Sequence, residues 1–222
     1  MGNSRTVVAK RELRHHFSDL EQQREASSMG MWVFLVTEIM FFGGMFCCYL
    51  VYRYLYFHAW VEGSQHMEFW YGTINTVVLI GSSLTMALAV RASQLGQRKL
   101  LVLLLLLTIL LGLAFMGIKA VEYHQHWLNH EFPGSSFDLK KWQDAPHVEM
   151  FFVLYFTMTG FHALHVVIGL FAVGFVAYFA WRGRYTAEYH NPVENVGLYW
   201  HFVDLVWIYL YPLLYLISHR HA

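Results

Sequence analysis

The chain contains five apolar stretches that are each long enough to cross a lipid bilayer. A helix needs about 20 largely apolar residues to span a hydrocarbon core of roughly 30 Å. With 57% hydrophobic, 18% aromatic and only 14% charged residues, the composition is typical of a chain whose main solvent is lipid. The sequence therefore predicts an all-α, polytopic membrane protein built as a bundle of five transmembrane helices, with spans near 29–55, 70–91, 100–123, 149–181 and 195–217.

One membrane domain accounts for most of the chain. Residues 1–28 are polar and are expected to form a leader on the cytoplasmic or matrix side, residues 29–217 form the five-helix domain, and residues 218–222 form a C-terminal tail. Within the leader, Ser18-Asp-Leu-Glu21 is a capping-box pattern that predicts a short helix running toward the membrane surface.

The distribution of Lys and Arg predicts the orientation of the bundle. Ten cations lie in the leader and in the second and fourth connections: Arg5, Lys10, Arg11, Arg14, Arg24, Arg91, Arg98, Lys99, Arg182 and Arg184. The opposite side carries Lys140, Lys141 and Arg220. Cytoplasmic loops carry an excess of Lys and Arg, so the N-terminus is expected inside and the C-terminus outside.

Several ionisable side chains lie within the predicted spans. His201 and Asp204 are one helical turn apart in the fifth span, Glu38 lies near the middle of the first, and His162 and His165 lie in the fourth. A charge in hydrocarbon costs roughly 2.5 to 3.5 kcal/mol on insertion scales. We therefore expect these groups to satisfy one another or to face a neighbouring subunit. The histidines are interpreted first as hydrogen-bonded packing residues, whereas Glu38 is either structural or a group that stores or passes a proton.

A second polar pair lies near the outer end of the third span. Lys119 and Glu122 are three residues apart, and residues at this spacing are neighbours on a helix surface. We expect a local, structural ion pair in which Lys119 extends toward the lipid headgroups.

The longest connection, residues 124–148, is expected to form an irregular loop on the outer face, because it contains glycine, two prolines and several acidic residues. It also contains four histidines: His124, His126, His130 and His147. Their irregular spacing matches no metal-ligand pattern, so they are interpreted as solvated loop residues, with a metal site as the alternative.

Four motifs follow one another along the chain. They are Leu20-Glu-Gln-Gln-Arg-Glu-Ala-Ser-Ser-Met-Gly-Met-Trp32 leading into Thr37-Glu-Ile-Met-Phe-Phe42, then Glu122-Tyr123, then Thr159-Gly-Phe-His-Ala-Leu-His-Val-Val-Ile-Gly169, and Trp200-His-Phe-Val-Asp-Leu-Val-Trp207. In order and spacing these motifs resemble subunit III of cytochrome c oxidase, in the haem-copper oxidase subunit III family. The resemblance covers roughly residues 20 to 217.

The resemblance implies a non-catalytic subunit of a proton-pumping terminal oxidase of aerobic respiration, a complex that passes electrons to O2. Such a subunit binds no haem or copper itself, packs against the catalytic subunit I in a complex that also contains subunit II, and holds structural phospholipid. It supports proton uptake and protects subunit I during turnover. Glu38 matches the family's buried carboxylate that reacts with carbodiimides, and Glu122 matches its Glu-Tyr element. Four more residues occupy motif positions without an assigned role: His162, His165, His201 and Asp204.

Many family members have two additional N-terminal helices that form a lipid-filled cleft, whereas this chain resembles the five-helix form. The resemblance leaves the electron donor open between cytochrome c, free or membrane-bound, and a quinol. The alternatives are therefore subunit III of a quinol oxidase and an accessory subunit of nitric oxide reductase. The Glu-Gln-Gln-Arg-Glu run and Glu38 favour the cytochrome c branch.

The expected location is the bacterial inner (plasma) membrane, with the mitochondrial inner membrane as the alternative. A haem-copper centre needs several interior imidazoles, and only three histidines lie well inside the spans, so the redox metals are expected in partner subunits. No basic patch indicates nucleic-acid binding. A stand-alone proton channel or transporter remains a further hypothesis, although neither internal repeats nor broken helices around a midplane site are evident.

Overall fold

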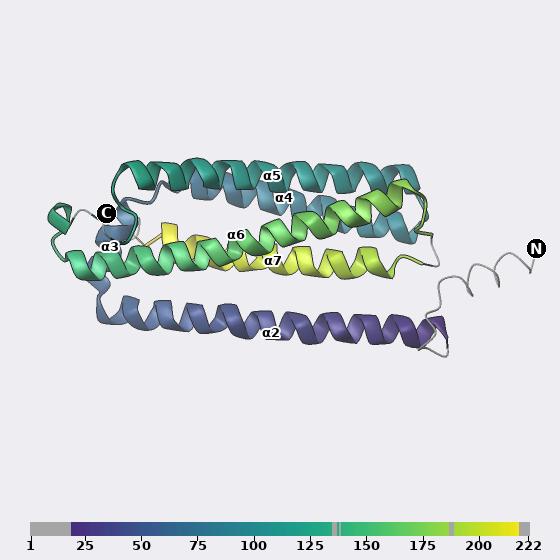
Figure 1. Cartoon of the computed structure of the whole chain (residues 1–222), viewed down its shortest axis with the longest axis horizontal. Coiled ribbons are helices and arrows are strands. Elements are labelled where there is room, and N and C mark those ends of the chain that lie inside the picture. The colour runs from purple at the N-terminus through teal and green to yellow at the C-terminus, as the bar shows by residue number, and fades with distance from the viewer. Residues whose placement is uncertain (1–18, 135–136, 138, 187–188, 218–222) are drawn as a thin grey trace, which may run out of the picture. The chain divides into compact units, whose positions relative to one another are not determined.

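The computed structural model describes residues 19–217 except 135, 136, 138, 187 and 188. Within this part of the chain every regular element is helical (Figure 1). The helices are α2 (Leu20–Leu55), α3 (Phe57–Gln65), α4 (Phe69–Gln94), α5 (Arg98–Leu128), the short 3-10 helix η1 (Leu139–Lys141), α6 (Ala145–Trp181) and α7 (Asn191–Tyr215). The predicted all-α class is confirmed.

Four helices are long and apolar enough to cross a membrane, namely α2, α4, α5 and α6. Helix α7 has 25 residues, enough for a span, but it also contains Glu194, His201, Asp204 and Pro212, which lower its hydropathy. The described residues thus include four helices that could cross a membrane by their length and composition. The count of five spans stays a prediction.

The chain divides into two compact units, Met1–Met40 and Phe41–Ala222. Helix α2 begins after Asp19, whose Oδ1 accepts a hydrogen bond from the backbone N–H of Gln22 at 2.7 Å. A side-chain acceptor at this position satisfies one of the free N–H groups of the first turn. The expected short leader helix is therefore the first part of one continuous helix. Ser18, the first residue of the predicted capping box, lies outside the described residues.

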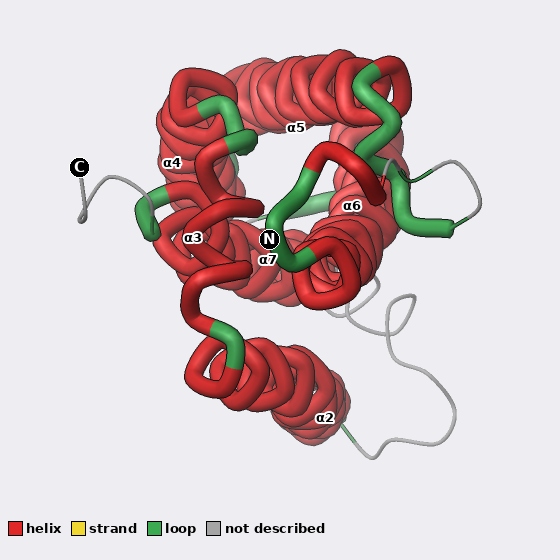
Figure 2. The backbone as a smooth tube through the Cα atoms, turned by 90° about the vertical axis from the view of Figure 1, so that its left-hand side faces the viewer, coloured by secondary structure: helices red, strands yellow, loops and turns green. Residues whose placement is uncertain are grey.

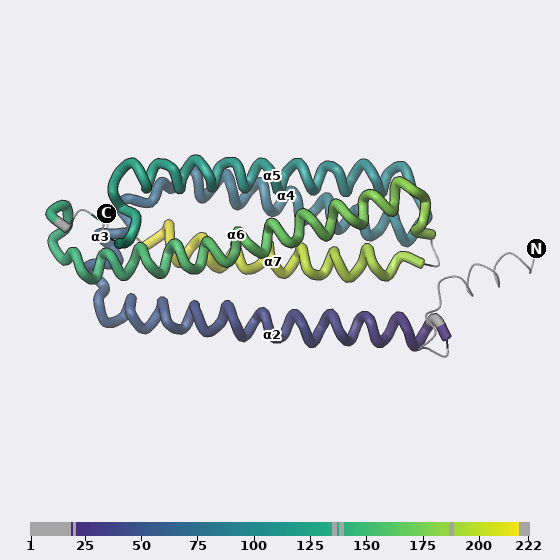
Figure 3. The backbone as a smooth tube through the Cα atoms, in the orientation of Figure 1, coloured from purple at the N-terminus to yellow at the C-terminus, as the bar shows by residue number. Residues whose placement is uncertain are grey.

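In the second unit, α4, α5, α6 and α7 form a ring in which each helix packs against the next and α7 closes back on α4 (Figure 2). The chain direction alternates from helix to helix, so the end of α4, the start of α5, the end of α6 and the start of α7 lie at one end of the ring, and the end of α5 and the start of α6 lie at the other (Figure 3). Helices α4 and α7 are far apart in the sequence but share a long seam. This seam positions several of the polar groups described below.

Trp200 on α7 fills the centre of this ring. Its side chain is buried. A methyl group added at Gly112 or at Gly169 would lie only 2.9 or 3.0 Å from carbon atoms of the indole ring, which is too close for a normal contact. The indole Nε1 donates a hydrogen bond to Ser82 Oγ on α4 at 3.1 Å. The two glycines therefore let α5 and α6 approach the indole closely, as small residues do in membrane bundles.

Arg98, the first residue of α5, caps the end of α6. Its Nε donates to the carbonyl oxygen of Ala180 at 3.2 Å, and its Nη2 donates to that of Trp181. A cation at a helix C-terminus stabilises the free carbonyl groups and the negative end of the helix dipole. Gly183 follows with φ of 75°, and a Cβ there would lie 2.9 Å from Arg98 Nη1. This contact joins the two short links at one end of the ring.

The connection predicted for residues 124–148 is shorter than expected. Helix α5 continues to Leu128 and α6 begins at Ala145, so His124, His126 and His147 are helical rather than in a loop. Helix α3 was not predicted at all. It has only nine residues, and it is held by packing rather than by propensity, because Trp60 and Gly63 are buried and Gly63 lies directly against the ring of Phe151 on α6.

Candidate functional site: buried polar groups of the helix ring

Lys119 and Glu122 form the expected ion pair, with Lys119 Nζ 3.0 Å from Glu122 Oε2. The prediction that Lys119 extends to the headgroups is wrong, because only 3% of Lys119 and 1% of Glu122 are exposed. Both side chains point into the ring. Lys119 Nζ also donates to the hydroxyl oxygens of Tyr155 at 3.1 Å and Tyr215 at 3.0 Å.

The two tyrosines close this cluster. Tyr155 donates its hydroxyl proton to Glu122 Oε1 at 2.6 Å, and Tyr215 donates to the same oxygen. The ammonium of Lys119 lies 5.1 to 5.7 Å from four aromatic ring centroids, those of Tyr123, Tyr155, Trp207 and Tyr215. Such faces attract a cation, most strongly where water is excluded. The cluster thus neutralises both charges internally and ties α5 to α6 and α7.

A second ionic cluster lies just beyond the end of α5. Glu131 is 1% exposed, with Oε2 2.7 Å from His126 Nδ1 and Oε1 2.6 Å from Lys141 Nζ. Burial by itself raises the pKa of the Glu131 carboxyl, but the hydrogen bonds and charges of His126 and Lys141 outweigh it and hold that pKa below its ordinary value. This cluster anchors the 129–144 connection to the end of α5. Among the described residues, no group of three His, Cys, Asp or Glu side chains is placed to hold a metal ion.

His162 is fully buried on the inner face of α6. Its ring lies between Phe115, with centroids 5.6 Å apart, and Trp207, with centroids 5.2 Å apart. Neither ring nitrogen has a hydrogen-bond partner within the described part of the chain, and the same is true of the fully buried amide of Asn75 on α4. His162 is therefore a packing residue, as expected, but without the hydrogen bonds that this interpretation assumed.

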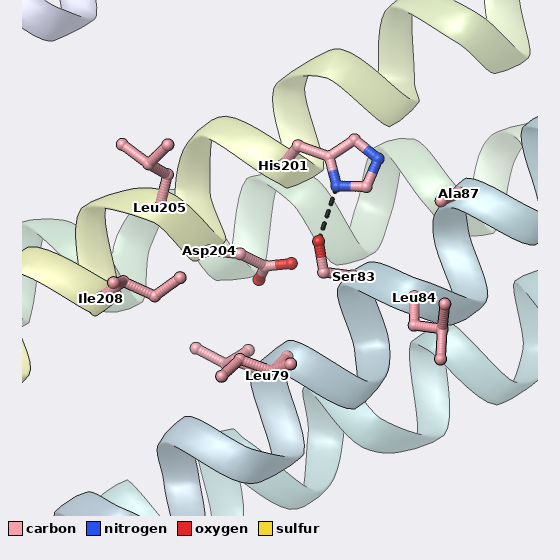
Figure 4. A pocket seen from close by; sticks show the side chains of 9 residues that line it. Leu79, Ser83, Leu84, Ala87, His201, Asp204, Leu205 and Ile208 are labelled. Carbon is pink, nitrogen blue, oxygen red and sulfur yellow. Dashed lines mark hydrogen bonds between the residues drawn. The ribbon is translucent and has the colours of Figure 1, made fainter.

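His201 and Asp204 lie on the α4–α7 seam (Figure 4). The sequence left open whether such groups satisfy one another or face a neighbouring subunit, and in the structure His201 Nδ1 shares a hydrogen bond with Ser83 Oγ on α4 at 2.7 Å. The Asp204 carboxyl lies beside this pair, is 3% exposed, and has no hydrogen-bond partner for either oxygen among the residues that the structure describes. The other alternative, that Asp204 faces a neighbouring subunit, stays a prediction.

His165 does not share the surroundings of His162, although the two are one helical turn apart. Its Nδ1 lies 2.8 Å from the carbonyl oxygen of Phe161, and its ring contacts Phe42 with centroids 5.1 Å apart. Glu38 lies on α2 within the unit that ends at Met40, and its side chain is partly exposed. The convergence of Glu38 with the three histidines and Asp204 therefore stays a prediction.

Four polar residues of these sites were missed in the sequence: Asn75, Ser83, Tyr155 and Tyr215. The tyrosines could have been found, because a buried tyrosine hydroxyl needs a partner and Glu122 offers one at the same depth. Ser83 had no such signal, since a serine in a spanning helix commonly bonds to its own backbone.

These features define the class of the protein, an all-helical protein with helices long and apolar enough to span a membrane and with a buried Lys119–Glu122 ion pair inside its helix ring. The family model described as cytochrome c oxidase subunit III matches residues 7–219. The chain therefore belongs to the cytochrome c oxidase subunit III family, and by this membership it is a subunit III of a haem-copper oxidase.

The alignments to known relatives cover most of the chain. It is 35% identical to cytochrome c oxidase subunit 3 of Corynebacterium diphtheriae over 193 residues, which is 86% of this chain and 88% of the relative. It is 32% identical to cytochrome c oxidase subunit 3 of Thermostichus vulcanus over 195 residues, 86% of this chain and 87% of the relative. It is also 28% identical to cytochrome bo(3) ubiquinol oxidase subunit 3 of Pseudomonas aeruginosa over 209 residues, 93% and 92% of the two chains. The resemblance stated from the motifs is confirmed.

Proposed function

We propose that this chain is a non-catalytic subunit that packs against subunit I of a proton-pumping cytochrome c oxidase, in a complex that also contains subunit II. In this role it supports proton uptake into subunit I and protects that subunit from inactivation during turnover. Haem and copper are held by the partner subunits, and phospholipid packs against the chain.

The closed Lys119–Glu122 cluster carries this proposal. The Glu122 carboxylate, the Lys119 ammonium and two tyrosine hydroxyl groups form hydrogen bonds with one another. We therefore assign this buried cluster a structural role rather than a catalytic one. The surroundings of His162 support the same conclusion, because its ring packs between the rings of Phe115 and Trp207 rather than against a second imidazole of the described residues with which it could share a haem iron.

Cytochrome c is the proposed electron donor of the complex, since the two relatives at 32% and 35% identity are named cytochrome c oxidase subunit 3. The relative from Pseudomonas aeruginosa favours a second candidate, subunit III of a quinol oxidase, because the match to it extends over 93% of this chain. The two candidates differ in the substrate of the whole complex rather than in the fold of this subunit.

We place the chain in the bacterial plasma membrane with five spanning helices, α7 being the fifth. The N-terminus lies inside and the C-terminus outside. Arg98 and Arg182 lie at one end of the α4–α7 ring and Lys141 at the other, which supports this orientation through the positive-inside rule.

The test is purification of the oxidase in mild detergent through a tag on this chain, followed by an absorption spectrum and identification of the co-purifying subunits. We expect haem-bearing subunit I and subunit II, and oxygen consumption with reduced cytochrome c. Oxygen consumption with a quinol alone favours the second candidate. Recovery of the chain without any haem protein contradicts both.

Glu38→Gln provides a direct check of the non-catalytic role. The variant should assemble and reduce oxygen at close to the parent rate, with at most modest losses in proton pumping or in durability during turnover. Complete loss of oxygen reduction in a fully assembled variant contradicts the proposal.

A further inference from the structure

A groove follows the seam between α4 and α7 on the outside of the helix ring (Figure 4). It consists of two adjoining hollows of about 380 and 370 Å³, which share Ala87 and His201. Glu194 lines the hollow nearer the start of α7, and Asp204 lines the other. Residues spaced three or four apart on both helices face the groove, so it runs along the helix axes.

Asp204 is the unusual residue of this groove. Its side chain is 97% buried by the chain itself, yet neither carboxyl oxygen has a hydrogen-bond partner among the described residues. The nearest polar side chain, Ser83, shares a hydrogen bond with His201 Nδ1, and its hydroxyl also lies close to the Asp204 carboxyl. Asp204 lies 13 residues after the start of α7, or about 20 Å along the helix axis. An unsatisfied carboxyl at this depth is strongly destabilising, so a donor from outside this chain is expected.

The rim of the hollow around Asp204 is apolar and open. Leu84 is 61% exposed, Leu205 52% and Ile208 48%. A polar floor within an apolar rim is the arrangement of a binding hot spot, in which the rim excludes water and strengthens the central hydrogen bond.

We propose that this groove binds a transmembrane helix of another oxidase subunit, which inserts a hydrogen-bond-donating side chain onto the Asp204 carboxyl. This inference rests on the proposed function and adds to it the face of the chain and the chemistry by which a partner binds. Leu84, Leu205 and Ile208 then pack against the apolar flanks of the inserted side chain.

A helix fits the groove better than a phospholipid does. The donors of a phospholipid lie in its headgroup, at the membrane surface, whereas Asp204 lies about 20 Å along a span where only acyl chains are present. A helix satisfies its own backbone within hydrocarbon and can present a donor side chain at any depth. Interhelical hydrogen bonds of this kind stabilise membrane bundles.

The test is photo-crosslinking in the intact oxidase in its native membrane, with benzoylphenylalanine in place of Leu84. The control is the same replacement at Leu110 of α5, which is 63% exposed and lines neither hollow. We expect position 84 to form an adduct with a peptide of another subunit, at least fivefold above position 110. An adduct only with lipid or quinone, or equal yields at both positions, overturns the proposal.

Two variants test the hydrogen bond itself. Asp204→Asn keeps an acceptor oxygen and should retain most of the adduct at position 84, whereas Asp204→Leu should reduce it at least fivefold. An unchanged adduct with Asp204→Leu overturns the role of Asp204. The proposed function fails in a different way, since the unsubstituted tagged chain would then recover no haem subunit at all.

Discussion

Replacing both members of the Lys119–Glu122 pair should weaken the protein by less than the sum of the two single replacements. In Lys119→Met, the Glu122 carboxylate keeps its bonds from Tyr155 and Tyr215 but loses the ammonium paired with it, in a site that is 1% exposed. Breaking a buried ion pair costs about 3–5 kcal/mol, mostly because the remaining charge is left uncompensated. We expect this loss for Lys119→Met, and a smaller one for Glu122→Gln because four aromatic faces still surround the ammonium.

The double variant Lys119→Met/Glu122→Gln leaves no buried charge, so its loss should be smaller than the sum of the single losses by about 1–3 kcal/mol. The assay is retention of the tagged chain in the detergent-solubilised oxidase as temperature is raised, with Lys99→Met, an exposed cation of the same helix, as the matched control. Each 1.4 kcal/mol corresponds to about a tenfold change in the equilibrium. Strictly additive losses, or a Lys119→Met variant as stable as Lys99→Met, would refute the reasoning.

Two further predictions concern packing and pH. Gly169→Ala places a methyl group 3.0 Å from the ring of Trp200, whereas Gly174→Ala on the same helix meets nothing within 4 Å. The Gly169→Ala variant should be less stable than the Gly174→Ala variant by about 1–3 kcal/mol in the same retention assay. Equal stability of the two variants would contradict the packing. The Glu131 pKa is held below its ordinary value of 4.5, so the stability that its bonds to His126 and Lys141 provide is complete above about pH 4.5 and is lost as the pH falls through the folded-state pKa. Protection of the Glu131 amide from hydrogen exchange, taken relative to the intrinsic rate at each pH, should fall in that range in the parent chain, and Glu131→Gln should remove this pH dependence of protection. An identical protection profile for both chains would contradict it.

The sequence predicted the helical membrane class because hydropathy over about 20 residues depends on the bilayer and not on tertiary contacts. The structure, rather than the sequence, shows which side chain Gly112 and Gly169 accommodate, that of Trp200. Helix ends were less predictable, because polar residues at the end of α5, such as His126, remain helical when they have a partner such as Glu131.

The direction of each polar side chain could not be read from the sequence. Lys119 at a helix end has the same local pattern whether it extends to the headgroups or turns inward, and only the aromatic residues of α6 and α7, distant in the sequence, decide the outcome. The partner of His201 was left open, and it is Ser83 on α4, 118 residues away in the sequence. Both outcomes depend on contacts between helices that are not neighbours in the sequence.

The most direct test of the central claim is to dissociate the tagged chain from the purified oxidase and to record absorption spectra of the two fractions. We predict that the entire Soret absorbance and the bound copper remain with the other subunits, which still reduce oxygen but inactivate faster during turnover. A Soret band in the fraction that contains this chain alone would contradict the account.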